Sequence, residues 1–244
     1  MRILTISIVA ILLLGGIVSK VVPSRPRTEP EAVAPDQIAD FAVLYRQNCS
    51  GCHGTNGTDG PATPLGNPAY LALADDATVR RVTAEGVAGT AMPAFAQSAG
   101  GLLTDKQIDV LVTGIRARWA QPNTLNGVQL PPYSSHNAGD ASRGATAYAT
   151  YCSSCHGPNG TGGPKASSIV DGSFLALVSD QGLRTAVIVG RPELGFPDWR
   201  NDVPGRPMPD QQISDVVAWM AAQRPKYPGQ PYSPSSMAKA GESR

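Results

Sequence analysis

The chain has 244 residues and a formal net charge of +1 at pH 7, and its composition includes 26 glycines and 22 prolines. This length suits two small domains, since one domain usually takes about 100–150 residues. A charge so near zero excludes a chain-wide electrostatic attraction to nucleic acid or to an anionic membrane surface. The glycine and proline content favours short helices joined by shaped loops and argues against a long sheet.

The first segment, residues 1–22, is predicted to be a membrane anchor or a signal segment. Its uncharged run of 17 residues, 3–19, is flanked by Arg2 and Lys20. That length is at the short limit for a membrane-spanning helix and somewhat long for the core of a signal peptide, and we favour an uncleaved anchor. Residues 23–35 are rich in proline and charge and are predicted to form a flexible tether. Both interpretations place the domains after the tether on the periplasmic, extracytoplasmic side.

A first domain is predicted over residues 36–120, with three helical segments. Asp36 is expected to cap a helix that continues to Tyr45, because apolar residues recur after it at helical spacing. A middle helix is expected over 76–85. The last helix begins at Thr104 with a capping-box pattern, and its apolar face carries Ile108, Leu111, Val112, Ile115 and Trp119.

The remainder of the chain repeats this order of helices. Asp140 is predicted to cap a helix that extends to Tyr151, a middle helix is expected over 181–189, and the last helix is expected to start at Pro209. The chain after the first domain therefore divides into a linker at 121–139, a second domain at 140–225 and a disordered Pro- and Ser-rich tail at 226–244.

All four cysteines fall in two identical patterns, CSGCH at residues 49–53 and CSSCH at residues 152–156. C-x-x-C-H is the signature of c-type haem attachment, in which each thiol adds to a haem vinyl group and the adjacent His ligates the iron. A disulfide, a zinc site and a thioredoxin-like pair are the alternatives. A zinc site does not explain why each His directly follows its second Cys, and the double occurrence after an export segment favours haem. The residues assigned to two covalently bound haems are Cys49, Cys52, His53, Cys152, Cys155 and His156.

The two motifs lie in an internal repeat. GCHGTNGTDGP at 51–61 runs parallel to SCHGPNGTGGP at 154–164, an offset of 103 residues, and the offset becomes 104 where 71–73 pairs with 175–177. A nearly constant offset of this kind indicates a duplicated domain. Helical units this small have little core of their own, so we expect one haem to supply the apolar centre of each copy.

At these residues the chain resembles the class I cytochromes c, in particular the diheme bacterial type with two domains in tandem. The resemblance covers about 36–224 and rests on CSGCHG, CSSCHG, the MPAF segment at 92–95 and the two terminal helices. It implies an all-α fold in which the first and last helices of each domain cross beside the haem. It also implies electron transfer among membrane respiratory or photosynthetic complexes, with no bond made at a substrate.

Met92 is the expected distal ligand of the first haem iron. It stands 39 residues after His53, on the loop between the middle and last helices, which is where the family pattern places such a ligand. A thioether ligand favours reduced iron and raises the potential relative to a second imidazole. The first site is therefore predicted to have His53 and Met92 as its metal ligands.

The second copy departs from this pattern. Carrying the 104-residue offset forward puts Phe196 opposite Met92, and a phenyl ring cannot bind iron. The favoured prediction is that the loop folds differently and delivers Met208, which lies between two prolines, to the iron held by His156. In the second interpretation Phe196 covers an open haem and Met208 packs at the entry to the last helix. His136, in the linker, is a third candidate ligand.

These residues favour an electron-transfer protein, either a membrane-tethered diheme carrier or the cytochrome subunit of a quinol-oxidising or terminal-oxidase complex. Its partners would be redox proteins and the membrane, with no nucleic acid. The competing class is a diheme enzyme such as a peroxidase, in which one haem keeps an open distal position. Neither distal loop presents an obvious His, Arg and acid group for O–O cleavage, so an electron-transfer role without catalysis is favoured.

Overall fold

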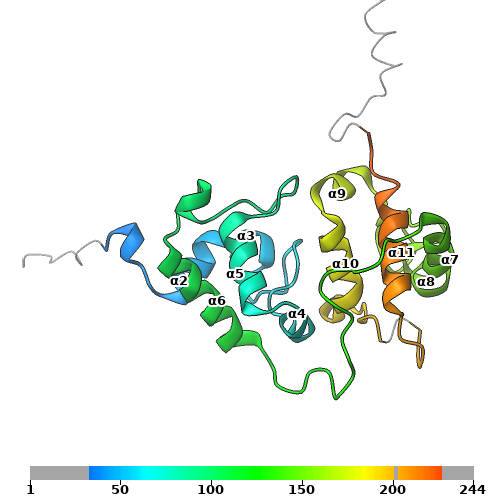
Figure 1. Ribbon diagram of the computed structural model, residues 1–244, viewed down its shortest axis with the longest axis horizontal. Coiled ribbons are helices and arrows are strands. Elements are labelled where there is room, and N and C mark those ends of the chain that lie inside the picture. The colour runs from blue at the N-terminus through cyan, green and yellow to red at the C-terminus, as the bar shows by residue number, and fades with distance from the viewer. Residues whose placement is uncertain (1–32, 201–202, 227–244) are drawn as a thin grey trace, which may run out of the picture. The chain divides into compact units, whose positions relative to one another are not determined.

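The computed structural model describes residues 33–200 and 203–226. Within that part of the chain every regular element is a helix, and β-pairing is limited to two isolated bridges, Ala96–Leu103 and Arg191–Phe196 (Figure 1). The all-α prediction is confirmed. None of the described helices is long and apolar enough to cross a membrane. The predicted anchor at 1–22 and almost all of the predicted tail lie outside the described residues.

Apart from η1, which occurs only in the first half, the two halves of the described chain contain the same series of helices. In the first half these are η1 (Pro35–Gln37), α2 (Phe41–Asn48), α3 (Ser50–His53), α4 (Pro68–Leu73), α5 (Asp76–Glu85), η2 (Gln97–Ala99) and α6 (Asp105–Trp119). In the second half they are α7 (Ala141–Tyr151), α8 (Ser153–His156), α9 (Gly172–Leu177), α10 (Asp180–Val189), η3 (Pro192–Leu194) and α11 (Asp210–Ala221).

The starts of the long helices follow their side-chain caps. Asp140 caps α7 by accepting a hydrogen bond from the Arg143 backbone N–H, as predicted, and Thr104 forms the predicted capping box with Gln107. The prediction for Asp36 is wrong, because α2 starts five residues later and is capped by Asp40. Ahead of this cap, the Ile38 carbonyl accepts a hydrogen bond from the Gln107 side chain of α6.

Close packing of the first and last helices organises each half. A methyl group added at Gly114 in α6 would come within 2.1 Å of the Phe41 ring in α2. One added at Gly144 in α7 would come within 2.0 Å of the Asp215 carbonyl in α11. Glycine therefore permits the close approach at both contacts. This pairing of terminal helices is the arrangement that the family resemblance implied.

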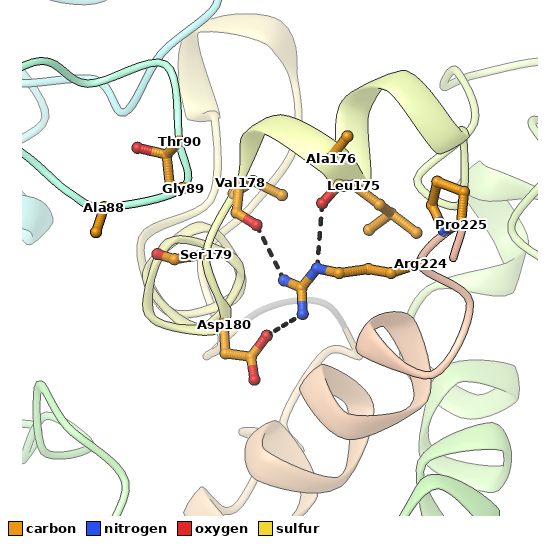
Figure 2. Close-up of a pocket in the computed structure, with 10 residues that line it drawn as sticks. All are labelled: Ala88, Gly89, Thr90, Leu175, Ala176, Val178, Ser179, Asp180, Arg224 and Pro225. Carbon is orange, nitrogen blue, oxygen red and sulfur yellow. Dashed lines mark hydrogen bonds and ion pairs between the residues drawn. The ribbon is translucent and has the colours of Figure 1, made fainter. Parts of the chain in front are cut away.

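In each half an arginine, Arg116 within α6 and Arg224 just after α11, connects the end of the half to its middle. In the first half Arg116 donates to the carbonyls of Leu71 and Ala74 and to the carboxylate of Asp76. In the second half Arg224 donates to the equivalent acceptors, the Leu175 and Val178 carbonyls and Asp180 (Figure 2). These acceptors lie at the end of one short helix and the start of the next. Each guanidinium therefore fixes the corner between two helices.

Candidate haem sites

Each CxxCH motif forms a short helical turn directly after the first helix of its half. Cys49 ends α2 with φ −117° and Cys152 ends α7 with φ −118°. The backbone N–H of His53 then bonds the Cys49 carbonyl at 3.0 Å, and that of His156 bonds the Cys152 carbonyl at 3.0 Å. The two motifs therefore have the same backbone geometry.

The imidazole rings of both motifs are oriented by backbone carbonyls. His53 Nδ1 lies 2.7 Å from the Thr63 carbonyl oxygen, and His156 Nδ1 lies 2.8 Å from the Ser167 carbonyl oxygen. A hydrogen bond at Nδ1 fixes the tautomer and leaves Nε2 as the nitrogen that can coordinate a metal. This donor set fits a c-type haem, because two thiols and one oriented imidazole come from each five-residue motif.

A tyrosine four residues before each motif holds the turn that comes after it. Tyr45 donates through its hydroxyl to the Gly54 carbonyl at 2.8 Å, and Tyr148 donates in the same way to Gly157. The repeat pairs these tyrosines, but it does not by itself assign them a role. The signal in the sequence is their constant distance of four residues from the first cysteine.

Burial determines the protonation behaviour of the first motif. His53 is 8% exposed, and its burial lowers the imidazole pKa, while the hydrogen bond to the Thr63 carbonyl acts in the opposite direction. Burial together with the neighbouring Cys52 raises the pKa of Cys49 to about 12. The Cys49 thiol is therefore neutral at pH 7, and the imidazole is held in the neutral form that a metal requires.

The alternatives to haem find no support in the arrangement of the side chains. Neither motif forms a disulfide in the structure. Within residues 33–200 and 203–226, no group of three or more His, Cys, Asp or Glu side chains is placed to hold a metal ion. The pocket in Figure 2 is lined by Ala88, Gly89, Thr90, Leu175, Ala176, Val178, Ser179, Asp180, Arg224 and Pro225.

The distal loops of the two halves share a backbone register. The Val87 N–H bonds the Met92 carbonyl at 3.0 Å, and the Arg191 N–H bonds the Phe196 carbonyl at 2.9 Å. Both pairs are related by the same 104 residues. Gly86, with φ +69°, packs against the backbone directly after Met92, and a Cβ there would lie 2.6 Å from the Ala94 nitrogen.

Gly190 makes the same contact in the second half. Its φ is +62°, and a Cβ would lie 2.2 Å from the Pro197 carbonyl oxygen. Only glycine adopts this conformation at such close range without strain. Phe196 is therefore the structural counterpart of Met92, as the repeat predicted.

Met208 has a different counterpart. The Leu103 N–H bonds the Phe95 carbonyl at 2.8 Å, and the Met208 N–H bonds the Trp199 carbonyl at 2.8 Å. Leu103 is 5% exposed and Met208 is 1% exposed, and both precede the last helix of their half. Met208 thus occupies a core position at the entry to α11. Its bond to the second iron stays a prediction, and this arrangement matches the alternative in which Met208 packs at the helix entry.

The structure also shows the positions of Phe196, His136 and the arginines that the sequence associates with the second site. The Phe196 ring stacks on the His156 imidazole, with centroids 5.8 Å apart and planes inclined by 26°. His136 is exposed on the linker. Arg191 pairs with Glu193 and Arg200 pairs with Asp198, while Arg206 lies 5.6 Å from the centre of the Tyr151 ring.

Comparison with known proteins assigns a family to each half. Residues 36–113 match the family model described as cytochrome c oxidase, cbb3-type, subunit III, and residues 141–224 match the model described as cytochrome c. No curated protein matches the sequence. These two matches, together with the CxxCH motifs, imply two covalently bound c-type haems.

Two solved structures resemble the chain only loosely. The reducing HAO-like protein complex of Kuenenia stuttgartiensis has 16% identity and a TM-score of 0.43, covering 80% of this chain and 99% of that one. Thiosulfate dehydrogenase of Marichromatium purpuratum has 20% identity and a TM-score of 0.32, covering 96% of this chain and 55% of that one. Neither likeness bears on function. The family matches confirm the resemblance drawn from the motifs: the chain belongs to the cytochromes c and carries two such domains in tandem.

Proposed function

We propose that this protein is a diheme electron carrier, or the cytochrome subunit of a larger redox complex, tethered to the membrane with its haem domains in the periplasm. The observation that carries the proposal is the pair of matching CxxCH turns, each with an imidazole oriented by a backbone carbonyl. Each bound haem supplies one-electron chemistry at its iron. The tether and the location rest on the apolar run at 3–19 and on the need to attach haem after export.

The chain's own contribution is to hold and tune the two groups. His53 and His156 are assigned as proximal ligands, and Met92 is assigned as the distal ligand of the first site. Support for Met92 comes from its place on the loop after α5 and from its partly buried side chain. His53 is 8% exposed, and such burial limits solvent access to the proximal imidazole, which is one of the factors that set a redox potential.

An enzymatic role is the alternative, because the residue at the ligand position of the second half is Phe196. A peroxidase would also need charged groups to polarise the peroxide bond. Each arginine of this loop contacts a neighbour: Arg191 pairs with Glu193, Arg200 pairs with Asp198, and Arg206 lies over the Tyr151 ring. Electron transfer is therefore the function that we propose, with a quinol-oxidising or terminal-oxidase complex as the class of partner.

The test is a redox titration of the haem-loaded full chain in detergent. We expect two haems per chain from the pyridine haemochrome and the intact mass, and reversible uptake and release of two electrons. Hydrogen peroxide turnover should not exceed that of a heat-denatured sample of equal haem content. Irreversible reduction, or peroxide turnover well above this control, would contradict the carrier role. Mild solubilisation followed by mass analysis of the co-purifying subunits then separates a lone carrier from a complex subunit.

A further inference from the structure

We infer that the second haem lacks a sulfur ligand from this chain, and that its sixth coordination position is a binding site for a small neutral diatomic molecule such as carbon monoxide or nitric oxide. The inference requires the haem held by Cys152 and Cys155. It does not depend on whether the protein is a carrier or an enzyme, so it can fail without the proposed function failing.

The residue at the ligand position of the second half is a phenylalanine. Two independent backbone features relate the loops by 104 residues: the bond that closes each loop at Met92 or Phe196, and the close approach of Gly86 or Gly190 to the backbone just beyond. A phenyl ring has no lone pair to donate to iron. The position that supplies sulfur in the first half therefore supplies none in the second.

Met208, the nearest sulfur along the chain, is held in the core. Its backbone N–H bonds the Trp199 carbonyl at the place where Leu103 bonds Phe95 in the first half. Its side chain is 1% exposed and packs in a cluster with Trp199 and Ile213. Delivering this sulfur to the iron would empty a packed core position at the start of α11, and a cavity of that kind destabilises a fold.

The remaining candidate donors are a methionine in the helix core and a histidine on the linker. Met220 is 4% exposed within the α11 core cluster, and His136 is exposed on the linker that precedes α7. Phe196, in contrast, contacts the His156 ring directly. The side chain next to the expected iron position is therefore apolar.

The chemistry of this position selects the kind of ligand. An anion would need a counter-charge. Of the three arginines on the loop, Arg191 and Arg200 pair with acidic side chains, and Arg206 lies over the Tyr151 ring. A large ligand would have to displace the Phe196 ring. A small, neutral π-acceptor that binds ferrous iron meets both conditions, and carbon monoxide is the probe that reports it optically.

The experiment measures carbon monoxide stoichiometry on the reduced, haem-loaded full chain, after mass spectrometry has confirmed two haems. We expect one carbon monoxide for every two haems in the unmodified protein. In the oxidised protein the near-infrared sulfur-to-iron charge-transfer band should have the intensity of a single haem. Phe196→Met should abolish carbon monoxide binding and double the band, because it places a thioether at the ligand position.

Met208→Leu is the matched variant, since leucine is the natural residue at the equivalent position in the first half. We expect it to leave both the band and the carbon monoxide stoichiometry unchanged. Loss of half of the band in this variant, with a second carbon monoxide bound, would overturn the inference and establish Met208 as the ligand. Failure of the unmodified two-haem protein to bind carbon monoxide would also overturn it, whether sulfur or His136 fills the position.

Discussion

In the second half, the buried carboxylate of Asp215 accepts several hydrogen bonds. Its side chain is 3% exposed and accepts hydrogen bonds from the Asp140 backbone, from Arg143 and from Gln211. The Arg143 hydrogen bond is the largest cause that lowers its pKa, to about 2. The corresponding residue in the first half, at an offset of 105, is Val110. This network therefore belongs to the second half and could not be inferred from the repeat.

The pH dependence of stability follows from the sign of that shift. A carboxylate whose folded pKa lies below its unfolded value of about 3.9 stabilises the fold above that value and loses its contribution as pH falls toward the folded pKa. Asp215→Asn should lower the free energy of unfolding by about 1–3 kcal/mol at pH 7. The difference between the two proteins should shrink as pH falls from about 4 toward 2.

Urea unfolding of both proteins at several pH values, followed by circular dichroism, measures this difference. Asp36→Asn is the control, since Asp36 is an exposed carboxylate in η1. A gap between wild type and Asp215→Asn that stays constant down to a pH of about 2 would exclude the carboxylate as its source.

Among the helices, the contact of α7 with α11 is the tightest point of the second half. A Cβ on Gly144 would lie 2.0 Å from the Asp215 carbonyl and 2.7 Å from the Trp219 Cβ. Gly144→Ala should therefore force the helices apart and destabilise the fold by about 1–3 kcal/mol or more, although alanine is the better helix former. Thr146→Ala, on an exposed position of the same helix, should change stability by less than about 0.5 kcal/mol. Chemical denaturation of the holo-protein distinguishes the two outcomes.

The arginine that fixes the α9–α10 corner provides a second test at this scale. Arg224→Ala removes three hydrogen bonds, two of them to backbone carbonyls, and should destabilise the second half by about 1–3 kcal/mol. Arg118→Ala, an exposed arginine of α6, serves as the control and should have little effect. Hydrogen exchange should accelerate at the start of α10 in Arg224→Ala. Equal hydrogen-exchange protection at the start of α10 in both variants would show that Arg224 does not stabilise this corner.

How far the sequence predicts these elements depends on which contacts are local. The caps at Asp140 and Thr104 were predictable, because each involves residues three positions apart. The Asp36 prediction failed, because Asp40 offers the same kind of local cap four residues later and is the residue that caps α2. The short helices α4 and α9 were not predicted as helices; their sequence equivalence is visible, but six residues give little helical periodicity.

At the scale of the whole chain, the two halves differ in the lengths of their loops. The offset is 103 at the CxxCH turns, 104 at the middle helices and 105 at the last helices. The final extra residue lies between Trp199 and Met208, and this places Met208 opposite Leu103. Both candidates, Phe196 and Met208, can be located in the sequence. The choice between them cannot, because it rests on backbone hydrogen bonds across the loop.

Removing one haem at a time tests this asymmetry in the intact chain. Replacing Cys152 and Cys155 by alanine should leave one haem and the full charge-transfer band of the unmodified protein. Replacing Cys49 and Cys52 should also leave one haem, with the band absent, because Met92 is the only expected sulfur ligand. Intact mass and near-infrared absorption measure both quantities. A band of equal strength in the two variants would show that both halves carry the same ligation.

Arg116 and Arg224 bind equivalent acceptors in the two halves, although the arginines themselves are not at equivalent positions. Their three acceptors are related by a constant 104 residues, whereas Arg116 and Arg224 are 108 apart. The position that corresponds to Arg116 in α11 is Ala221, and the guanidinium arrives from three residues farther on, after that helix has ended. A residue-by-residue alignment of the two halves would score this interaction as lost. The carbonyls at the helical corner occupy equivalent positions in both halves, and an arginine from either of two chain positions can bind them. In this corner the acceptors therefore show the relation between the two halves better than the donors do.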